Sequence, residues 1–377
     1  MGHDGPVEWF DTVVVGGGQA GLAMGYHLAR QGREFVILDA GERGRDAWRG
    51  RWDSLRLFSP AAFNALPGMP FPAPNRYFPT KDETADYLEE YVRKFDLPVR
   101  LGRQVDSLRG YGEVYLVSTG EERCLAQNVV VATGPNHTPR VPEFARRLDP
   151  SIVQLHSSRY RNPGQLPEGD ALVVGVGNSG AEISVELSAS RHTYLSGREA
   201  GNIPVILPRD YISRAAYAGI VASLWIINRA LNVDTRAGRK LKEYDRRGGS
   251  PLARLSPKDI ARAGVERVPR VEGVVDGRPE LADGRVLEVA SVVWATGFKA
   301  DFGWIELPVF EEDGSPLHYR GVVEGESGLY FLGLPFQYTI TSAFIDGVGR
   351  DARHIADDIA GRTRKQNDLL ISRGLAR

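Results

Sequence analysis

Short runs of apolar residues recur along the chain, and two of them lead directly into a glycine-rich turn and then a helical pattern. The run at residues 12–15 precedes Gly-Gly-Gly-Gln-Ala-Gly at residues 16–21, and apolar positions with helical spacing follow to residue 31. A second apolar run precedes Gly-Val-Gly-Asn-Ser-Gly at residues 175–180. A buried strand, a tight glycine turn and a helix in this order form the unit that binds the pyrophosphate of a dinucleotide. The pattern therefore predicts two dinucleotide sites in one chain.

Each glycine of such a turn has its own task. The first makes the turn, the second lets the backbone approach the pyrophosphate, and the third lets the helix pack against the strand. The phosphates then rest on the N–H groups and the positive dipole end of the helix. On this basis we assign to cofactor binding Gly16, Gly18, Gln19 and Gly21 in the first unit and Gly175, Gly177, Asn178, Ser179 and Gly180 in the second.

The strand that follows each turn separates the two sites chemically. The strand at residues 34–39 ends in Asp39, at about the 20-residue distance at which a carboxylate bonds ribose hydroxyls, and this favours a nucleotide without a 2′-phosphate. The strand at residues 193–196 ends instead in Ser196, and Arg198 follows. A hydroxyl and a guanidinium can bond a 2′-phosphate that a carboxylate would repel, so we predict NADPH at the second site. The alternative is that Arg198 is an ordinary solvated surface arginine.

A second matching pair of strands indicates how the domains are connected. Residues 129–134 and 291–298 each contain an apolar run followed by Ala-Thr-Gly, where the chain would cross between domains. We therefore expect an α/β fold with two Rossmann-type dinucleotide-binding domains. The NADPH-binding domain, residues 150–288, would be inserted into a discontinuous first domain formed by residues 1–149 and 289–377.

The second domain is expected to carry a helical insertion at residues 209–268. Apolar positions are mixed there with Arg and Lys, which favours a solvated helical segment. Alternatively, the apolar part at residues 212–231 forms a lid or wall over a lipophilic substrate site, or a surface that contacts a membrane.

Composition narrows the function. The chain has 377 residues, enough for two domains, and a formal net charge of −1. No basic patch points to nucleic acid, no cluster has metal-ligand spacing, and no apolar stretch is long enough to span a membrane. The first residues lack the features of an export signal, so we expect a cytoplasmic protein, with a homodimer left open. Cys124 is the only cysteine, which rules out an intrachain disulfide and a cysteine-pair electron relay.

The two glycine turns, the two Ala-Thr-Gly strands and the missing cysteine pair together resemble the flavin-containing monooxygenases of the class B flavoprotein group. The resemblance covers most of the chain and is closest to compact bacterial and YUCCA-type members, through Trp-Arg-Gly-Arg-Trp-Asp-Ser-Leu-Arg-Leu at residues 48–57. His-Ser-Ser-Arg-Tyr-Arg at residues 156–161 fits the second half of the family fingerprint, whereas its first half, Phe-x-Gly, is absent. Tyr160 stands where the Baeyer–Villiger members carry tryptophan, so the match leans toward oxygenation of nitrogen or sulfur.

The resemblance implies FAD at the first site and NADPH at the second. It implies a monooxygenase that uses O₂, forms a C4a-(hydro)peroxyflavin and oxygenates a small lipophilic substrate at nitrogen, sulfur or a carbonyl. It also implies cofactor contacts from the tryptophan- and arginine-rich stretch, from the Ala-Thr-Gly segments and from the C-terminal helix expected to start near Gly349, namely Trp48, Arg49, Arg51, Thr133, Gly134, Thr296, Gly297, Gly347 and Val348. Alternatively, Trp48, Arg49, Arg51 and Trp52 tie a long loop down, and the two roles are not exclusive.

The polar candidates for contacting the reacting oxygen or the nicotinamide are Ser59, Asn64 and Gln337, and the alternative for each is an ordinary loop cap. For His156 we prefer a structural role, a hydrogen bond to backbone at the domain crossing, over a catalytic one. Two other functions are compatible with the same residues. One is an NADPH:acceptor flavin reductase or oxidase, and the other is a flavin-binding redox sensor.

Overall fold

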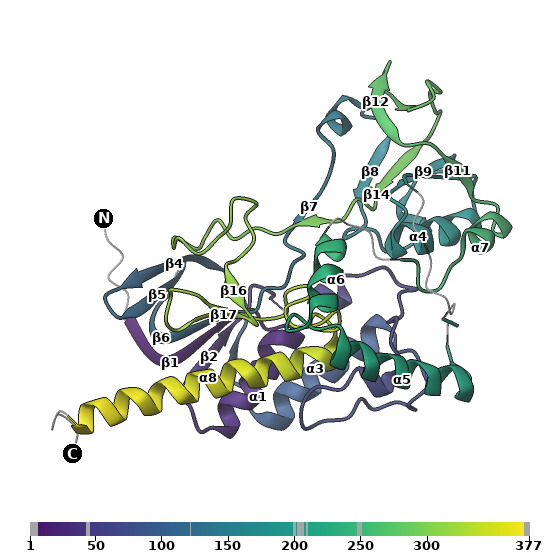
Figure 1. Cartoon of the computed structure of the whole chain (residues 1–377). Helices are drawn as coiled ribbons and strands as arrows, with labels where there is room; N and C mark the ends of the chain where they lie inside the picture. The colour runs from purple at the N-terminus through teal and green to yellow at the C-terminus, as the bar shows by residue number, and fades with distance from the viewer. Residues whose placement is uncertain are drawn as a thin grey trace.

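Two β-sheets, each with parallel strands at its centre, organise the chain (Figure 1). The larger sheet lies at the lower left of Figure 1 and the smaller one at the upper right. The computed structural model describes residues 7–42, 46–120, 122–198, 201, 207–208, 210–246 and 251–372.

Within the described ranges, the larger sheet is built from β1 (Val7–Val15), β2 (Phe35–Leu38), β3 (Val99–Arg100), β4 (Val105–Tyr111), β5 (Val114–Thr119), β6 (Arg123–Val131), β16 (His318–Tyr319), β17 (Val322–Val323) and β18 (Leu329–Phe331). The strand order is β16-β17-β18-β6-β1-β2-β3, and the β4–β5 hairpin extends from β6. The central strands from β18 to β3 run parallel, whereas the pairs β4–β5, β5–β6, β16–β17 and β17–β18 are antiparallel.

The smaller sheet is built from β8 (Val153–His156), β9 (Ala171–Val174), β10 (Thr193–Ser196), β11 (Glu266–Val268) and β14 (Ser291–Trp294). All of its pairs are parallel, in the order β11-β10-β9-β14-β8. Its helices are α4 (Asn178–Ser188) and α7 (Pro257–Arg262), and the β12 (Val271–Val275) and β13 (Arg278–Leu281) ribbon stands above it.

This architecture confirms the expected α/β fold. The larger sheet takes strands from the sequence before and after the smaller sheet, so the smaller sheet belongs to a domain inserted into a discontinuous one. One strand differs from its predicted place. Residues 291–294, which the expected boundary gave to the first domain, form β14 between β8 and β9. The apolar run alone could not reveal which sheet it joins. The chain returns to the larger sheet only after Trp294. There β15 (Phe298–Lys299) pairs with β7 (Thr138–Pro139), which lies in the segment that leads from the larger sheet to the smaller one.

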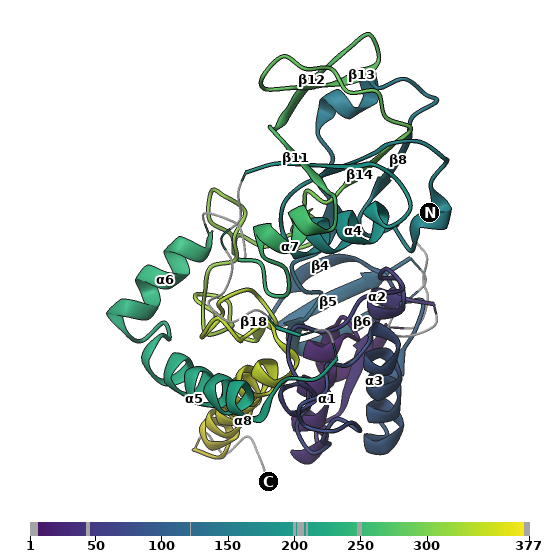
Figure 2. The same ribbon diagram turned by 90° about the vertical axis from the view of Figure 1, so that its right-hand side faces the viewer.

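The helical insertion is shorter than expected and lies at the outer edge of the molecule. It contains α5 (Arg214–Ala230) and α6 (Arg236–Arg246), which Figure 2 shows standing away from both sheets. Residues 266–268, inside the predicted insertion, are strand β11 of the smaller sheet. The expected start at Arg209 lies outside the described residues.

Three helices cover one face of the larger sheet, namely α1 (Gln19–Arg30), α3 (Lys81–Phe95) and α8 (Ile345–Ser372). Successive residues of a strand face opposite sides. Val14 of β1 therefore packs in the core under these helices, and Val13 packs in the second core with the β4–β5 hairpin. Shorter helical turns are α2 (Asp46–Arg49), η1 (Ala61–Phe63), η2 (Glu143–Arg147) and η3 (Pro163–Gln165).

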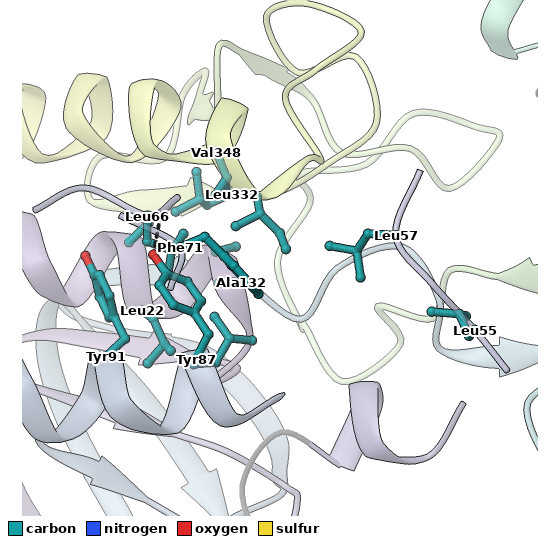
Figure 3. Close-up of a cluster of buried hydrophobic side chains, with 14 of the residues drawn as sticks. Leu22, Leu55, Leu57, Leu66, Phe71, Tyr87, Tyr91, Ala132, Leu332 and Val348 are labelled. Carbon is teal, nitrogen blue, oxygen red and sulfur yellow. Dashed lines mark hydrogen bonds between the residues drawn. The ribbon is translucent and has the colours of Figure 1, made fainter. Parts of the chain in front are cut away.

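The core under the helices also anchors the long loop between α2 and α3 (Figure 3). Tyr87 of α3 and Val348 of α8 both contribute to this core. The hydroxyl of Tyr87 accepts a hydrogen bond from the N–H of Leu66 at 2.6 Å and donates one to the carbonyl of Met69 at 2.7 Å. Because buried backbone groups need partners, Tyr87 fixes the loop that carries Ser59 and Asn64.

Candidate active site

The second glycine of each turn faces open space. Gly18 and Gly177 are the N-cap residues of α1 and α4, and their φ angles of −74° and −72° are accessible to any residue. A Cβ added at either position would meet no atom within 4 Å. Among the described residues no side chain caps either helix, so the first N–H groups of both helices are left for a ligand. A pyrophosphate fits this pair of cradles.

The first and third glycines are tightly packed instead. A Cβ at Gly16 or Gly175 would lie 2.6 Å or 2.2 Å from the carbonyl oxygen of the alanine that begins the corresponding Ala-Thr-Gly segment. Both residues also have positive φ angles, +108° and +115°. A Cβ at Gly21 or Gly180 would lie 1.9 Å or 1.8 Å from the carbonyl of the first glycine of the same turn. The two turns therefore share one construction, and each Ala-Thr-Gly segment is part of it.

Asp39 lies at the end of β2, beside the first turn. Its Oδ2 atom accepts a hydrogen bond from the N–H of Gly17 at 2.7 Å, and its Oδ1 atom accepts one from Gly41 at 2.7 Å. These bonds hold the carboxylate where it could accept hydrogen bonds from ribose hydroxyls.

The corresponding end of β10 is basic. Ser196 is fully buried, and its hydroxyl donates to the carbonyl of Pro269 at 2.8 Å and accepts from the N–H of Val271 at 3.0 Å. This hydroxyl is therefore occupied, which corrects the expectation that it would bond a 2′-phosphate. Arg198 is exposed. Arg267 of β11, which the sequence reading missed, donates to the carbonyl of Gly197 at 3.0 Å and adds a second guanidinium at this edge.

A cavity of about 300 Å³ lies where the two dinucleotide units converge. Gln19 at the start of α1 and Ser179 near the start of α4 both line it. Apolar side chains form most of the remaining wall, namely Trp48, Trp52, Leu55, Leu57, Phe58, Ala343, Phe344 and Ile345. A larger open hollow near Arg33 is lined by none of the glycine-turn residues, so the smaller cavity is the candidate active site.

Ser59 and Asn64 both line this cavity. The Ser59 hydroxyl donates a 2.6 Å hydrogen bond to Oδ1 of Asn64. The amide group of Asn64 donates to the carbonyls of Ser59 at 2.8 Å and Pro60 at 3.1 Å. Asn64 is 1 % exposed and its polar atoms are used within the loop, whereas the hydroxyl oxygen of Ser59 can still accept a hydrogen bond.

Trp48 links three walls of the cavity through Gln19. The indole N–H of Trp48 donates to Oε1 of Gln19, and Nε2 of Gln19 donates to the carbonyl of Ala343, both at 3.3 Å. The α2 turn, α1 and the segment before α8 are thereby held together.

The two arginines beside Trp48 have different surroundings. Arg49 forms ion pairs with Asp86 and Glu89 of α3, each at 2.7 Å, and these raise the pKa of its guanidinium. It is not among the cavity-lining residues, and its ion pairs tie the α2 turn to α3, which matches the alternative of a loop-holding role. Arg51 lines the cavity, and its side chain makes no hydrogen bond or ion pair within the described part of the chain. Burial lowers the pKa of Arg51.

Trp52 adds an unused donor to the same wall. Its side chain is 3 % exposed, and its indole N–H has no hydrogen-bond partner among the described residues. A buried indole N–H ordinarily finds a partner. An acceptor atom of a cofactor or substrate in the cavity would satisfy it, and this fits a site built for a ligand.

Three other residues that were expected to contact the cofactors or the substrate do not line the cavity, namely Gln337, Gly347 and Val348. Gln337 is 1 % exposed, and its amide bonds the backbone of Leu334, Arg320 and Phe331, so it stabilises a loop outside the cavity. The C-terminal helix begins at Ile345, ahead of the expected start near Gly349. Val348 is therefore buried in the core and Gly347 packs on Thr341, while residues 343–345 face the cavity.

The Ala-Thr-Gly segments and His156 meet at the crossings. Gly134 and Gly297 both have positive φ angles, +74° and +79°, as each strand ends. The hydroxyl of Thr296 donates to a backbone carbonyl in the segment that leads from the larger sheet to the smaller one. Thr133 lies just before that segment. Nε2 of His156 lies 3.0 Å from the carbonyl oxygen of Gly297, which is the expected contact with backbone at the domain crossing, and burial lowers the pKa of His156.

Arg254 ties the two domains together beneath the cavity. It comes from the second domain, and its guanidinium donates to the carbonyl of Arg56 at 2.7 Å and to that of Leu57. It also lies 5.0 Å from the ring of Phe58 and 3.5 Å from Glu182 of α4. No local sequence pattern predicts this contact, because its partners are backbone atoms almost 200 residues away.

Comparison with known proteins identifies the family. The model of the pyridine nucleotide-disulphide oxidoreductase family matches residues 13–200. An uncharacterized oxidoreductase CzcO-like of Geobacillus kaustophilus is 41 % identical over 351 residues, covering 93 % of this chain and 98 % of that protein. The probable indole-3-pyruvate monooxygenase YUCCA9 of Arabidopsis thaliana is 30 % identical over 387 residues, covering 94 % and 90 %. A flavin-containing monooxygenase from Stenotrophomonas maltophilia superimposes with a TM-score of 0.74 at 28 % identity, over 95 % of this chain and all of that one. The chain belongs to the class B flavin monooxygenase family.

Membership confirms a flavin-dependent oxidoreductase, with FAD and NADPH as its cofactors. Although one matching family is named for disulphide chemistry, Cys124 is the only cysteine and is buried, and burial raises the pKa of its thiol to about 11. Within the described ranges, no helix is long and apolar enough to cross a membrane. The same ranges hold no group of His, Cys, Asp or Glu side chains suited to a metal ion.

Proposed function

We propose that this protein is an FAD- and NADPH-dependent monooxygenase that oxygenates a small lipophilic substrate at nitrogen, sulfur or a carbonyl. One observation carries the proposal. Gln19 of the first dinucleotide unit and Ser179 of the second line the same apolar cavity. A flavin held by the first unit and a nicotinamide held by the second would therefore meet in one cavity.

In this proposal Gly18 and Asp39 hold FAD, and Gly177 and Arg198 hold NADPH. Bound FAD would supply hydride acceptance from NADPH and activation of O₂ at its C4a position. Arg51 would bond an anionic group of a cofactor or substrate, since its partly buried guanidinium makes no ion pair among the described residues. The Trp52 N–H would donate to an acceptor atom in the cavity.

The cavity wall would decide what happens to activated oxygen. The apolar side chains of Trp48 and Leu55 would limit access of water once cofactors and substrate are bound, which favours transfer of oxygen to a substrate over release as hydrogen peroxide. Ser59 would accept a hydrogen bond from the cofactor or substrate, and Asn64 would act as a positioning residue that fixes the Ser59 hydroxyl.

A substrate panel tests the proposal. Amines, sulfides, ketones and 2-oxo acids of moderate size would be incubated with the holoenzyme, NADPH and O₂, and product mass would be compared with NADPH consumed. Oxygenated product in amounts close to the NADPH consumed supports the proposal. If every class instead yields hydrogen peroxide in proportion to NADPH, the protein is an oxidase. A flavin that NADPH does not reduce would indicate a binding protein.

A further inference from the structure

Helix α5 presents an apolar face to the outside of the molecule. Residues 218, 221, 222, 225, 226 and 229 follow the spacing of one helical stripe and are all exposed; we call them the α5 stripe. Within it, Val221 is 42 %, Trp225 66 % and Ile226 55 % exposed. A surface helix normally turns its apolar side toward the core. The reversed arrangement marks the α5 stripe as a contact surface.

The opposite side of α5 is fixed to the protein, so the stripe faces outward because of packing. The ring of Tyr217 lies 5.8 Å from that of Phe63. Oδ1 of Asn228 accepts hydrogen bonds from the hydroxyls of Thr339 at 2.9 Å and Thr341 at 2.8 Å. These contacts set the rotation of the helix about its axis.

The surroundings of the stripe are positively charged. Residues 214–240 contain five basic residues and one acidic residue, in a chain whose formal net charge is −1. The acidic residue, Asp234, accepts hydrogen bonds from the hydroxyls of Tyr319 and Tyr338. Its carboxylate is thus engaged within the protein, and the basic side chains dominate this surface.

A hollow of about 600 Å³ opens beside the stripe, and both aromatic and basic side chains line it. The Arg229 guanidinium lies 5.9 Å from the ring of Trp225, and that of Arg350 lies 5.0 Å from the ring of Tyr338. All four residues line the hollow. Guanidinium groups beside aromatic rings at the edge of an apolar face suit the headgroup region of a membrane.

We propose that α5 and the start of α6 bind an anionic membrane surface. Val221, Trp225 and Ile226 enter the interface, and Arg229 and Arg236 contact lipid phosphates. A second copy of the chain is a poorer occupant, because a two-fold contact through the stripe would bring equal basic groups together. This inference goes beyond the proposed function and does not depend on it.

Vesicle sedimentation of the full-length holoenzyme tests the proposal. The protein should sediment with vesicles of phosphatidylcholine containing phosphatidylglycerol, bind vesicles of phosphatidylcholine alone much more weakly, and be released by salt. The double variant Trp225→Ser/Ile226→Ser should bind at least about tenfold more weakly. Arg229→Gln and Arg236→Gln should each weaken binding about fivefold. Trp9→Ser, which removes a tryptophan that is 48 % exposed on β1, should bind like the wild type.

A spectroscopic arm and an oligomer measurement complete the test. The wild type should show a blue shift of tryptophan emission on adding the anionic vesicles, and Trp225→Phe should bind without that shift. Failure of the wild type to sediment, or unchanged binding by the double variant, overturns the proposal. It is also overturned if ultracentrifugation shows a dimer that the double variant abolishes while vesicles have no effect, because a second copy then covers the stripe.

Discussion

Ser59 donates its hydroxyl proton to Asn64 across 2.6 Å, and Asn64 returns both amide protons to the carbonyls of Ser59 and Pro60. The loop at the cavity therefore holds its own polar groups in place. Asn64 acts through Ser59, and Ser59 is the member of the pair that can still accept a hydrogen bond from a ligand.

Substitutions at these positions should separate the two roles. Asn64→Ala leaves the carbonyl of Ser59 without its amide donor and leaves the carbonyl of Pro60 with only the N–H of Phe63, so it should lower the free energy of unfolding by about 1–3 kcal/mol. Ser59→Ala keeps those bonds and should cost no more than about 1 kcal/mol. Urea unfolding of both variants measures the difference. Equal losses would show that the amide bonds of Asn64 do not hold the loop.

The two second glycines should control the two cofactors independently. Val at either position needs no backbone strain and meets no protein atom at its Cβ, but it fills the space for a pyrophosphate. Gly18→Val should lose FAD, measured by flavin absorbance against protein. Gly177→Val should keep FAD and lose reduction by NADPH. Full flavin occupancy in Gly18→Val would refute the assignment of the first site.

The fold was predictable where each element carries its own signal. The strand, turn and helix around residues 16–21 and 175–180 identify themselves by apolar runs and glycines, and the structure has both. Strand β14 shows the limit, because an apolar run of four residues does not specify which sheet it joins. The start of helix α3 also carries a local signal, the capping box of Thr80 and Glu83.

The candidate site was predictable only in part. Ser59 and Asn64 line the cavity as expected. The amide group of Gln337, which has similar chemistry, instead forms hydrogen bonds with backbone groups that only the folded loop brings near it. Arg49 and Arg51 are two residues apart, yet α3 supplies carboxylates to one and not the other. Such differences depend on tertiary contacts, which the sequence pattern does not contain.

Arg198 should set the preference between the nicotinamide cofactors. Arg198→Ala removes a charge-assisted contact worth about 1.5–3 kcal/mol and should raise the KM for NADPH about ten- to a hundredfold, with little change in the maximal rate of flavin reduction. Steady-state kinetics with NADPH and NADH measure this. Arg262→Ala, at an arginine whose side chain is 79 % exposed, is the control and should leave both values unchanged. An intact NADPH preference in Arg198→Ala would mean that this guanidinium does not contact the 2′-phosphate.

Asp346, at the start of α8, should make stability depend on pH. Burial raises its pKa to about 6, so the folded state binds more protons than the unfolded state between roughly pH 4 and pH 6. Stability is therefore lost as pH rises through this window. Asp346→Asn should add at most about 3 kcal/mol at pH 7.5 and nothing below about pH 4.

Urea unfolding at both pH values checks this prediction. Asp283→Asn is the control, because Arg285 lowers the pKa of that carboxyl and its removal should bring no gain at pH 7.5. A gain in Asp346→Asn that is equal at both pH values would show that ionisation of the carboxyl is not its cause.

The central claim is that both dinucleotide units serve one apolar cavity in which O₂ is used for oxygenation. Isotope labelling tests it most directly, with the holoenzyme, NADPH, ¹⁸O₂ and the best substrate of the panel. The account predicts one ¹⁸O atom in each product molecule and close to one product per NADPH oxidised. Product that carries oxygen from water, or NADPH oxidation that ends only in labelled hydrogen peroxide, would contradict it.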